Sequence, residues 1–313
     1  MPRFDVTIAG ELNLDLILYG LPAELPPDRE LLADRMMLTL GGSSSIVAHN
    51  LAALGSRVGF QSLIGDDQMG RTALQLLGEI GVDVSRIRQN PGPIKSGMSV
   101  ILQRDGWRNI LTYSGTIAEL SFEDLDLAYL ADSRHFHLSS YYLQDRLRPH
   151  IPELFTKLKA AGLTISMDTN DDPDDLWGSG LRDVLGQLDI FMPNAREACR
   201  ITGTEDLEDA VNQLAEQVPL VVVKMGHEGA MARQGANRFT SPPAKVTCID
   251  AVGAGDSFDA GFLHQYVRGQ DIPSCLAYGN LSGALSTTKP GGTEAFRDRK
   301  HREQFLGEFA EAR

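Results

Sequence analysis

The chain has 313 residues, of which 42% are hydrophobic and 23% are charged, and its formal net charge is −13 at pH 7. This length and composition predict a globular protein with one large core, and the acidic balance argues against nucleic acid or an anionic membrane surface as its main partner. Three cysteines without CxxC spacing are typical of reduced thiols, and the sequence shows neither a secretion signal nor an apolar stretch of membrane-spanning length. We therefore expect a cytoplasmic protein that acts on a small molecule.

The first part of the chain alternates between apolar strands and helices with apolar residues at helical spacing. Proline-rich residues 22–27 separate two of the strands by a loop. We predict strands at 4–9, 12–18, 31–40 and 58–64, and helices at 43–54 and 69–80.

A hairpin interrupts this alternation. Two apolar runs, 96–103 and 107–113, are joined through Arg104-Asp105-Gly106, and Asp-Gly is a strong hairpin signal. Alternation then resumes, with strands predicted at 135–139, 163–168, 190–193 and 220–225 and helices at 148–161, 194–201 and 207–217.

Strands that alternate with helices predict a mostly parallel sheet covered by helices on both faces. We therefore predict that residues 1–313 form a single α/β domain, a three-layer α/β/α sandwich. The hairpin and two early strands, at about 12–18, 31–40 and 96–113, are expected to form a small β-sheet lid. This lid would lie over the carboxyl edge of the large sheet, where α/β folds bind ligands.

The most informative stretch is DAVGAGDSFDAGF, from Asp250 to Phe262. A helix is predicted to begin at Ala254, and Gly253 and Gly255 let the backbone approach a ligand closely. The free N–H groups and the positive dipole end of such a helix form an anion site. Asp256, in its first turn, would also stabilise the helix by charge alone.

The whole string resembles the C-terminal signature of the ribokinase-like (PfkB) carbohydrate kinases, and the resemblance extends from GELNLDLI near the start to TTKPGGTEAF near the end. It implies that Asp256 is the general base for the acceptor hydroxyl, and that the amides of Gly253, Ala254, Gly255 and Asp256 stabilise the transferring phosphoryl group. Asp250 resembles the family acid beside a monovalent cation, and a residue that organises the turn is the alternative interpretation.

Two motifs resemble the family's acceptor site. Asp15 looks like the aspartate that hydrogen-bonds sugar hydroxyls, a role that needs a group with several lone pairs. Gly41-Gly42 is similar to the diglycine that approaches the substrate and acts as the lid hinge. The alternatives are an exposed strand acid for Asp15 and an ordinary turn for the diglycine.

Other motifs resemble the family's nucleotide site. Asn194 and Glu197 match an NxxE motif that acts on nucleotide phosphates and on water-coordinated Mg²⁺, although their i, i+3 spacing also suits a helix cap. ATP and Mg²⁺ are the implied cofactors, and a requirement for K⁺ is left open. The remaining candidates are Lys224 near the phosphates, Gly226 and Gly229 in the nucleotide loop, and Asn280 beside the adenine.

The chain departs from the family pattern at Ile46, where sugar kinases usually have an asparagine that reaches substrate hydroxyls. We hypothesise that the substrate meets this corner with fewer hydroxyls than ribose has, unless Asn50, one helical turn further, reaches it. Met98 and Val100 alternate on a lid strand, where they either cover the ligand or pack within the lid.

These motifs predict an ATP-dependent kinase that phosphorylates a hydroxyl of a small sugar or related polyol. A nucleoside is an alternative acceptor, and so is a sugar phosphate, because Arg35, Lys95, Arg104 and Arg108 lie on or near the predicted lid.

Two other classes of protein fit the sequence less well. A degenerate nucleotide sensor is expected to lose the acid at position 256, and a dinucleotide-dependent oxidoreductase needs its glycine turn after the first strand. Because lids of the family often pair between subunits, the resemblance also implies a homodimer through the lid.

Overall fold

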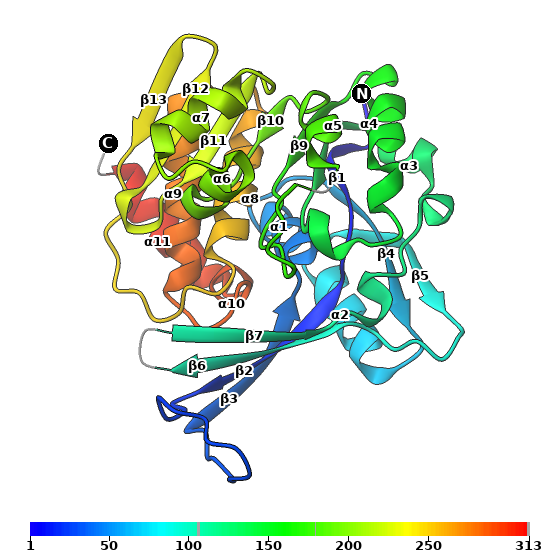
Figure 1. Cartoon of the computed structure of the whole chain (residues 1–313), viewed down its shortest axis with the longest axis vertical. Coiled ribbons are helices and arrows are strands. Elements are labelled where there is room, and N and C mark those ends of the chain that lie inside the picture. The colour runs from blue at the N-terminus through cyan, green and yellow to red at the C-terminus, as the bar shows by residue number, and fades with distance from the viewer. Residues whose placement is uncertain (105–106, 179, 312–313) are drawn as a thin grey trace.

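The computed structural model describes residues 1–104, 107–178 and 180–311. Its centre is a nine-stranded sheet in the order β13-β12-β11-β10-β9-β8-β1-β4-β5, and a four-stranded sheet in the order β3-β2-β6-β7 projects from one side (Figure 1). Among the described residues, no helix is long and apolar enough to cross a membrane.

The large sheet is parallel from β5 to β11, and the hairpin β12–β13 extends it with antiparallel strands. Strands such as β1, β4 and β11 read as nearly continuous apolar runs because both faces of the sheet are covered there. Their bounds are β1 Phe4–Ala9, β4 Val58–Gly65, β5 Asp83–Asn90, β8 Ser133–Leu138, β9 Thr164–Met167, β10 Ile190–Phe191, β11 Leu220–Lys224, β12 Ala230–Gln234 and β13 Asn237–Ser241.

Two hydrophobic clusters show how the helices cover this sheet. Val6 and Ile8 of β1 belong to one cluster, whereas Phe4 and Ala9 belong to the other, on the opposite face. The first cluster includes residues of α1 (Ser43–Ala53), α2 (Gln68–Glu79), α8 (Ala254–Tyr266) and α9 (Ile272–Thr287). The second includes residues of α3 (Leu127–Ala131), α4 (Ile151–Ala160), α5 (Leu181–Leu185), α6 (Ala195–Thr202) and α7 (Leu207–Ala215).

Shorter elements complete the two helical layers. Helices α10 (Glu294–Arg297) and α11 (Arg299–Glu311) pack against α9 through a small cluster that contains Leu285, Phe296 and Phe305. Single turns of 3₁₀ helix lie at Gly115–Ile117, Phe122–Asp124, Tyr141–Leu143, Arg148–His150 and Gly226–Glu228.

The small sheet is the predicted lid. It contains β2 (Asn13–Tyr19), β3 (Arg35–Gly41), β6 (Met98–Arg104) and β7 (Trp107–Tyr113). Strand β2 pairs antiparallel with β3 and parallel with β6, which pairs antiparallel with β7. The chain passes from β1 through Gly10 into β2, so that the lid starts at the carboxyl edge of the large sheet.

The three-layer α/β/α architecture and the lid confirm the fold class expected from the sequence. The third predicted strand, 31–40, is too long, because β3 begins only at Arg35, where its pairing with Tyr19 starts. Strand β5 was not predicted, because its sequence DVSRIRQN carries the charges of an exposed sheet edge. Of the predicted hairpin turn, Asp105 and Gly106 lie outside the described residues.

The lid register also decides the position of Met98 and Val100. Leu14 pairs with Met98 and Leu16 with Val100, whereas Asp15 pairs with Ser99. Because neighbouring residues of a strand point to opposite faces, Met98 and Val100 lie on the face opposite Asp15. This register favours the alternative that they pack within the lid, away from the predicted acceptor residue Asp15.

Candidate active site

The predicted acceptor residues meet where the chain passes from the large sheet into β2 of the lid. Asn13 pairs with Gly41 across β2 and β3, and the diglycine then leads into α1, whose N-cap is Gly42. A Cβ atom at Gly41 would overlap the Asp15 carboxylate, and one at Gly42, where φ is +80°, would overlap Asn13 Oδ1. Only glycine lets the backbone approach these two side chains so closely.

Asp15 is almost fully buried beside this diglycine. Burial, together with the negative charges of Asp256 and Glu11, raises the pKa of Asp15 to about 7, although hydrogen bonds from Ser99 and Asn13 act in the opposite direction. The negative charge of Asp256 has the largest effect of any charged group on Asp15, so the predicted hydroxyl-binding acid and the predicted base lie near one another.

Helix α8 begins as the sequence analysis expected. Gly253 is its N-cap with φ +70°, and no side chain of the described residues caps it. Ala254 N donates to Ala251 O at 3.3 Å, so that the amides of the following first-turn residues are the ones best placed for an anion. A Cβ atom at Gly253 would lie 2.6 Å from the Cα atom of Gly292, which means that two glycine turns touch here.

Asp256 is buried in the first turn of α8. Its Oδ1 atom accepts a hydrogen bond from Asn170 Nδ2 at 3.4 Å, and Ser43, at the start of α1, also hydrogen-bonds it. Burial and the Asp168 carboxylate raise the pKa of Asp256 to about 6, whereas the Lys224 ammonium lowers it. The acid is thus ionised at neutral pH and still basic enough to accept a proton.

Lys224, at the end of β11, is held between two buried carboxylates. Its Nζ atom lies 2.5 Å from Asp168 Oδ2 and 3.0 Å from Asp259 Oδ2. Asp259 lies one helical turn after Asp256, and the sequence analysis did not assign it a role. The Lys224 ammonium is therefore paired with Asp168 and Asp259, close to the predicted base Asp256.

Asn194 and Glu197 form the cap of α6. Asn194 Oδ1 accepts from Glu197 N at 2.9 Å, and Glu197 Oε2 accepts from Asn194 N at 2.8 Å, which is a complete capping box. Asn194 also forms an isolated bridge with Lys224. Burial and Asp168 raise the pKa of Glu197 to about 7. Asn194, Glu197, Lys224 and Asp256 are therefore brought together.

The other nucleotide residues lie elsewhere along the same side of the sheet. Asn280 Nδ2 donates to the carbonyls of Ser241 and Pro242, both at 3.0 Å. A Cβ atom at Gly229, where φ is +89°, would overlap Ser241 O, and Gly226 lies in the same turn with φ +59°. The two hydrogen bonds of Asn280 thus connect α9 to the residues that contact the predicted nucleotide loop. Asn280 is not part of the group around Asp256.

Asp250 connects the lid to the loop that leads into α8. Its carboxylate accepts hydrogen bonds from Tyr19 Oη at 2.7 Å and Gln103 Nε2 at 2.8 Å, both on lid strands. It also accepts from the backbone amides of Val252 and Gly291 at 3.0 Å. This arrangement matches the alternative interpretation of Asp250 as a residue that organises the turn.

Ile46 is buried in α1 against the backbone of the two glycine turns. A Cβ atom at Gly292 would lie 2.8 Å from Ile46 Cδ1, and one at Gly253 would lie 3.4 Å from it. Asn50 does not replace the missing asparagine, since its Nδ2 atom donates to Ser257 Oγ at 2.9 Å and Gly292 O at 3.1 Å. Ile46 packs against the two glycine turns, and Asn50 hydrogen-bonds the second of them.

Glu11 was not recognised from the sequence, although it lies beside the diglycine. Its Oε1 atom accepts from Ser44 N at 3.0 Å and Ser140 Oγ at 2.7 Å, and its Oε2 atom accepts from Ser44 Oγ at 2.6 Å. Ser140 N in turn donates to Asn170 Oδ1 at 2.8 Å. Polar residues that follow β8 and β9 are thus joined to Glu11 and the diglycine.

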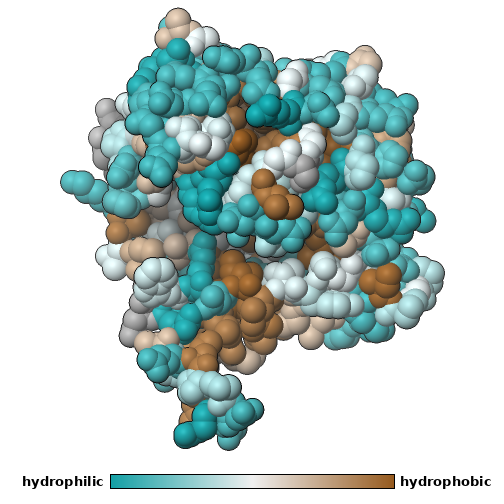
Figure 2. All heavy atoms as spheres, viewed as in Figure 1, coloured by the Kyte–Doolittle hydropathy of each residue, from teal (hydrophilic) through white to brown (hydrophobic). Residues whose placement is uncertain are grey.

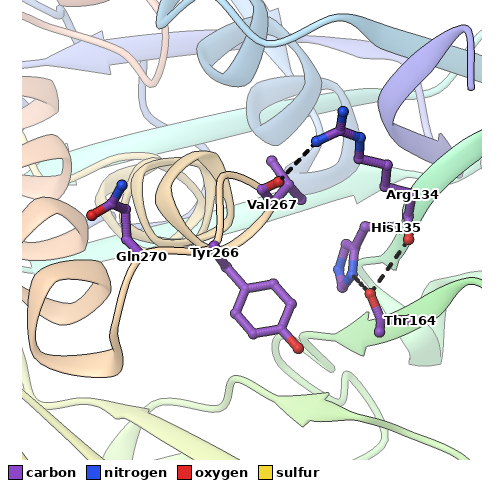
Figure 3. A pocket seen from close by; sticks show the side chains of 7 residues that line it. Arg134, His135, Thr164, Tyr266, Val267 and Gln270 are labelled. Carbon is purple, nitrogen blue, oxygen red and sulfur yellow. Dashed lines mark hydrogen bonds between the residues drawn. The ribbon is translucent and has the colours of Figure 1, made fainter. Parts of the chain in front are cut away.

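A further hollow of about 390 Å³ lies at the opposite, amino edge of the sheet (Figure 3). Arg134, His135 and Thr164 line it from β8 and β9, and Tyr266 from the end of α8. No residue predicted from the sequence to bind ATP or the acceptor lines this hollow, so we assign the candidate site to the carboxyl edge.

A parallel sheet with a β-sheet lid, and a buried acid in the first turn of an uncapped helix at the sheet's carboxyl edge, define the class of ribokinase-like kinases. A family model described as "pfkB family carbohydrate kinase" matches residues 3–299. The chain therefore belongs to the pfkB family and is a phosphotransferase.

Named relatives agree with this assignment. The chain is 29% identical to a 2-dehydro-3-deoxygluconokinase of Bacillus subtilis, covering 85% of this chain and 86% of the relative. It is 28% identical to a cytidine kinase of Thermococcus kodakarensis, covering 92% and 97%. A crystal structure of a putative ribokinase II of E. coli in complex with ATP and Mg²⁺ superposes with a TM-score of 0.82 at 26% identity, covering 97% and 99%.

Proposed function

We propose that this protein is a cytoplasmic ATP-dependent kinase that transfers a phosphoryl group to a hydroxyl of a small sugar or related polyol, with Asp256 as general base. The observation that carries this proposal is the position of Asp256. It is buried in the first turn of α8, beside the uncapped helix N-terminus and in the same site as Asp15.

In the proposed reaction, Asp15 accepts hydrogen bonds from the acceptor and orients it, while Asp256 receives the proton of the attacked hydroxyl. The N-terminal amides of α8 and its dipole stabilise negative charge on the transferring group. Asn170 and Ser43 hold the Asp256 carboxylate in place. The lid excludes water from the pocket, which strengthens each of these interactions.

The residues around Lys224 fit a magnesium nucleotide. Glu197 and Asp168 are buried, the Asp168 carboxylate raises the pKa of Glu197, and a cation would offset this repulsion. Mg²⁺ in such sites is usually held by one or two carboxylates, waters and substrate phosphates. ATP supplies the phosphoryl group when it is bound. Gly226, Gly229 and Asn280 would then lie along the nucleoside part.

In the described arrangement Asp250 does not fit the role of a direct K⁺ ligand. Its carboxylate oxygens already accept hydrogen bonds from two lid side chains and two backbone amides. A K⁺ requirement stays a prediction, to be checked by replacing KCl with the chloride of a large organic cation in the assay.

A homodimer through the lid is part of the proposal, with a second copy of this chain as the occupant of the lid's outer face. This face exposes large apolar side chains that the strand register places side by side, and Figure 2 shows apolar side chains gathered where the lid meets the main body. The exposed members are Met36, Leu38, Trp107, Leu111 and Tyr113.

The experiment that tests the proposed activity compares wild type with Asp256→Asn, a variant of nearly equal shape that cannot serve as a carboxylate base. We expect ATP consumption with Mg²⁺ and an acceptor from a panel of sugars, polyols and nucleosides to fall at least about 100-fold in the variant. An ATP-binding measurement should be unchanged. Equal turnover by both proteins would remove Asp256 as the base.

A further inference from the structure

We propose that the acceptor of this kinase carries no anionic group, so that uncharged polyols, nucleosides and amino sugars are its substrate class and sugar acids and sugar phosphates are not. This inference rests on the proposed function, since it concerns the pocket that contains Asp15 and Asp256. It follows from an excess of hydrogen-bond acceptors and negative charge in that pocket.

The charged groups closest to the predicted acceptor position are acidic. Among the described residues, the charges with the largest effect on Asp15 are those of Asp256 and Glu11. Asp256 in turn is affected most by Asp168, by Lys224 and by Glu11. The cation in this set, Lys224, is already paired with Asp168 and Asp259.

An unsatisfied acceptor atom supports the same conclusion. Asn13 is 2% exposed, and its Nδ2 atom donates to Asp15 Oδ1 and Leu14 O, both at 3.3 Å. These two acceptors fix the orientation of the amide. Asn13 Oδ1 is thus buried beside Gly42 and has no hydrogen-bond partner in the part of the chain that the structure describes. A buried acceptor of this kind needs a donor, which a hydroxyl or an amine supplies and a carboxylate or phosphate does not.

The lid cations that would favour a sugar phosphate are directed elsewhere. Arg35 lies over the ring of Tyr19 at 4.3 Å, and the Arg104 guanidinium donates to Ala23 O and Asn109 Oδ1.

The other two cations also lie away from Asp15. Lys95 lines a hollow with Met98 and Val100, on the lid face opposite Asp15. Arg108 pairs with Gln103, four residues along β6 from the partner of Asp15, which is roughly 13 Å of strand.

An anionic acceptor would therefore meet repulsion that, in the described part of the chain, none of these four lid cations lies close enough to Asp15 to offset. Two like charges about 4 Å apart in a partly buried site repel strongly enough to weaken binding by roughly 100-fold or more. Uncharged acceptors avoid this repulsion, and an amino sugar gains from the same carboxylates. The selectivity thus depends on the charge of Asp15 and its neighbours rather than on the shape of the pocket.

The test uses pairs of acceptors that differ in charge, D-glucitol with D-gluconate and D-ribose with D-ribose 5-phosphate, together with cytidine, glucosamine and 2-dehydro-3-deoxygluconate. ATP-coupled kcat/KM is measured for each. We expect the uncharged member of the preferred pair to react at least about 100-fold faster. Isothermal titration of the same pairs, in the presence of a non-hydrolysable ATP analogue, should show the same order in Kd.

A variant of Asp15 tests whether its negative charge causes the selectivity. At pH 8, above the Asp15 pKa of about 7, Asp15→Asn removes one negative charge. We therefore expect it to lower activity with uncharged acceptors and to reduce the ratio of kcat/KM between uncharged and anionic acceptors at least about tenfold. Asp66→Asn, an exposed residue paired with Arg71, is the matched control that changes net charge equally and leaves the ratio unchanged.

The outcomes are distinguishable. Turnover of gluconate, 2-dehydro-3-deoxygluconate or ribose 5-phosphate as fast as that of the uncharged compounds would overturn the inference while leaving the kinase activity in place. An unchanged ratio in Asp15→Asn would also overturn it. Failure of the protein to consume ATP with every compound would overturn the proposed function, and the inference with it.

Discussion

Asp256 accepts a proton only in its ionised form, and its neighbours move its pKa in opposite directions. Burial, Asp168 and Glu11 raise the pKa, whereas Lys224 and a hydrogen bond from Ser43 lower it, which leaves a value of about 6. In the folded protein the carboxyl is thus protonated below this pH and ionised above it. The pH dependence of the reaction should report this balance.

We predict that kcat/KM falls about tenfold per pH unit below pH 6, as expected for loss of one ionised base. Asp168→Asn removes a carboxylate that raises the pKa of Asp256, so its acid limb should lie at lower pH, while Asp259 still holds Lys224. A pH–rate profile of both proteins checks this, with Asp66→Asn as the surface control. An acid limb that moves to higher pH in Asp168→Asn would contradict the assignment.

At the scale of elements, the start of α8 depends on one backbone position. Gly253→Ala places a Cβ atom 2.6 Å from Gly292 Cα and forces alanine to adopt φ +70°. Because the clash is with backbone, the helix N-terminus must move, and we expect kcat to fall at least about 100-fold.

The matched control is Gly269→Ala, which has φ +75° but no atom within 4 Å of the new Cβ. It shares only the cost of the left-handed conformation, about 1 kcal/mol, and should retain kcat with a slightly lower Tm. Equal kcat losses in the two variants would mean that strain alone, and not the position of the helix start, accounts for the effect.

The lid is held to the rest of the protein at Asp250. Tyr19 and Gln103 donate to this buried carboxylate from β2 and β6, and Ile17, Ile101 and Val252 form a small hydrophobic cluster in the same place. These contacts connect the lid strands to the loop before α8, so that a movement of the lid would also move this loop.

Tyr19→Phe removes one donor from a buried carboxylate, which costs about 1–3 kcal/mol. We expect a lower Tm and a several-fold higher KM for the acceptor, with a smaller change in kcat. Tyr113→Phe, on the outer face of the lid, is the control, because Tyr113 is 56% exposed. Unchanged KM and Tm in Tyr19→Phe would show that the contact does not hold the lid.

At the scale of the whole molecule, the exposed outer face of the lid is the feature that a monomer does not explain. Contiguous exposed apolar surface of this kind is typical of interaction sites. Leu111→Asp should produce monomers at micromolar concentration in sedimentation velocity, because a charge would be buried in the interface. Leu176→Asp, at an exposed leucine that belongs to none of the lid strands, is the control. Wild-type protein that sediments only as a monomer would refute the homodimer.

The order of the elements follows from local sequence, and this part of the fold was predictable. Apolar periodicity places most strands and helices within a few residues of their observed bounds, and the GAGD turn marks the start of α8. The diglycine and Asp15 could also be picked out as candidates, because the stretches that contain them resemble motifs of the pfkB family. By contrast, β5 and the hairpin β12–β13 lie at sheet edges, where the apolar pattern is weak.

The sequence by itself determined the α/β layers, the lid and the identity of the predicted base, since each depends on residues that are close along the chain. Only the tertiary structure decided what surrounds that base. Asp259 and Asp168 meet at Lys224, Asp250 binds the lid, and Glu11 joins α1 to the end of β8. These contacts join residues far apart in sequence, and their effects depend on distance and burial. No local pattern encodes either quantity.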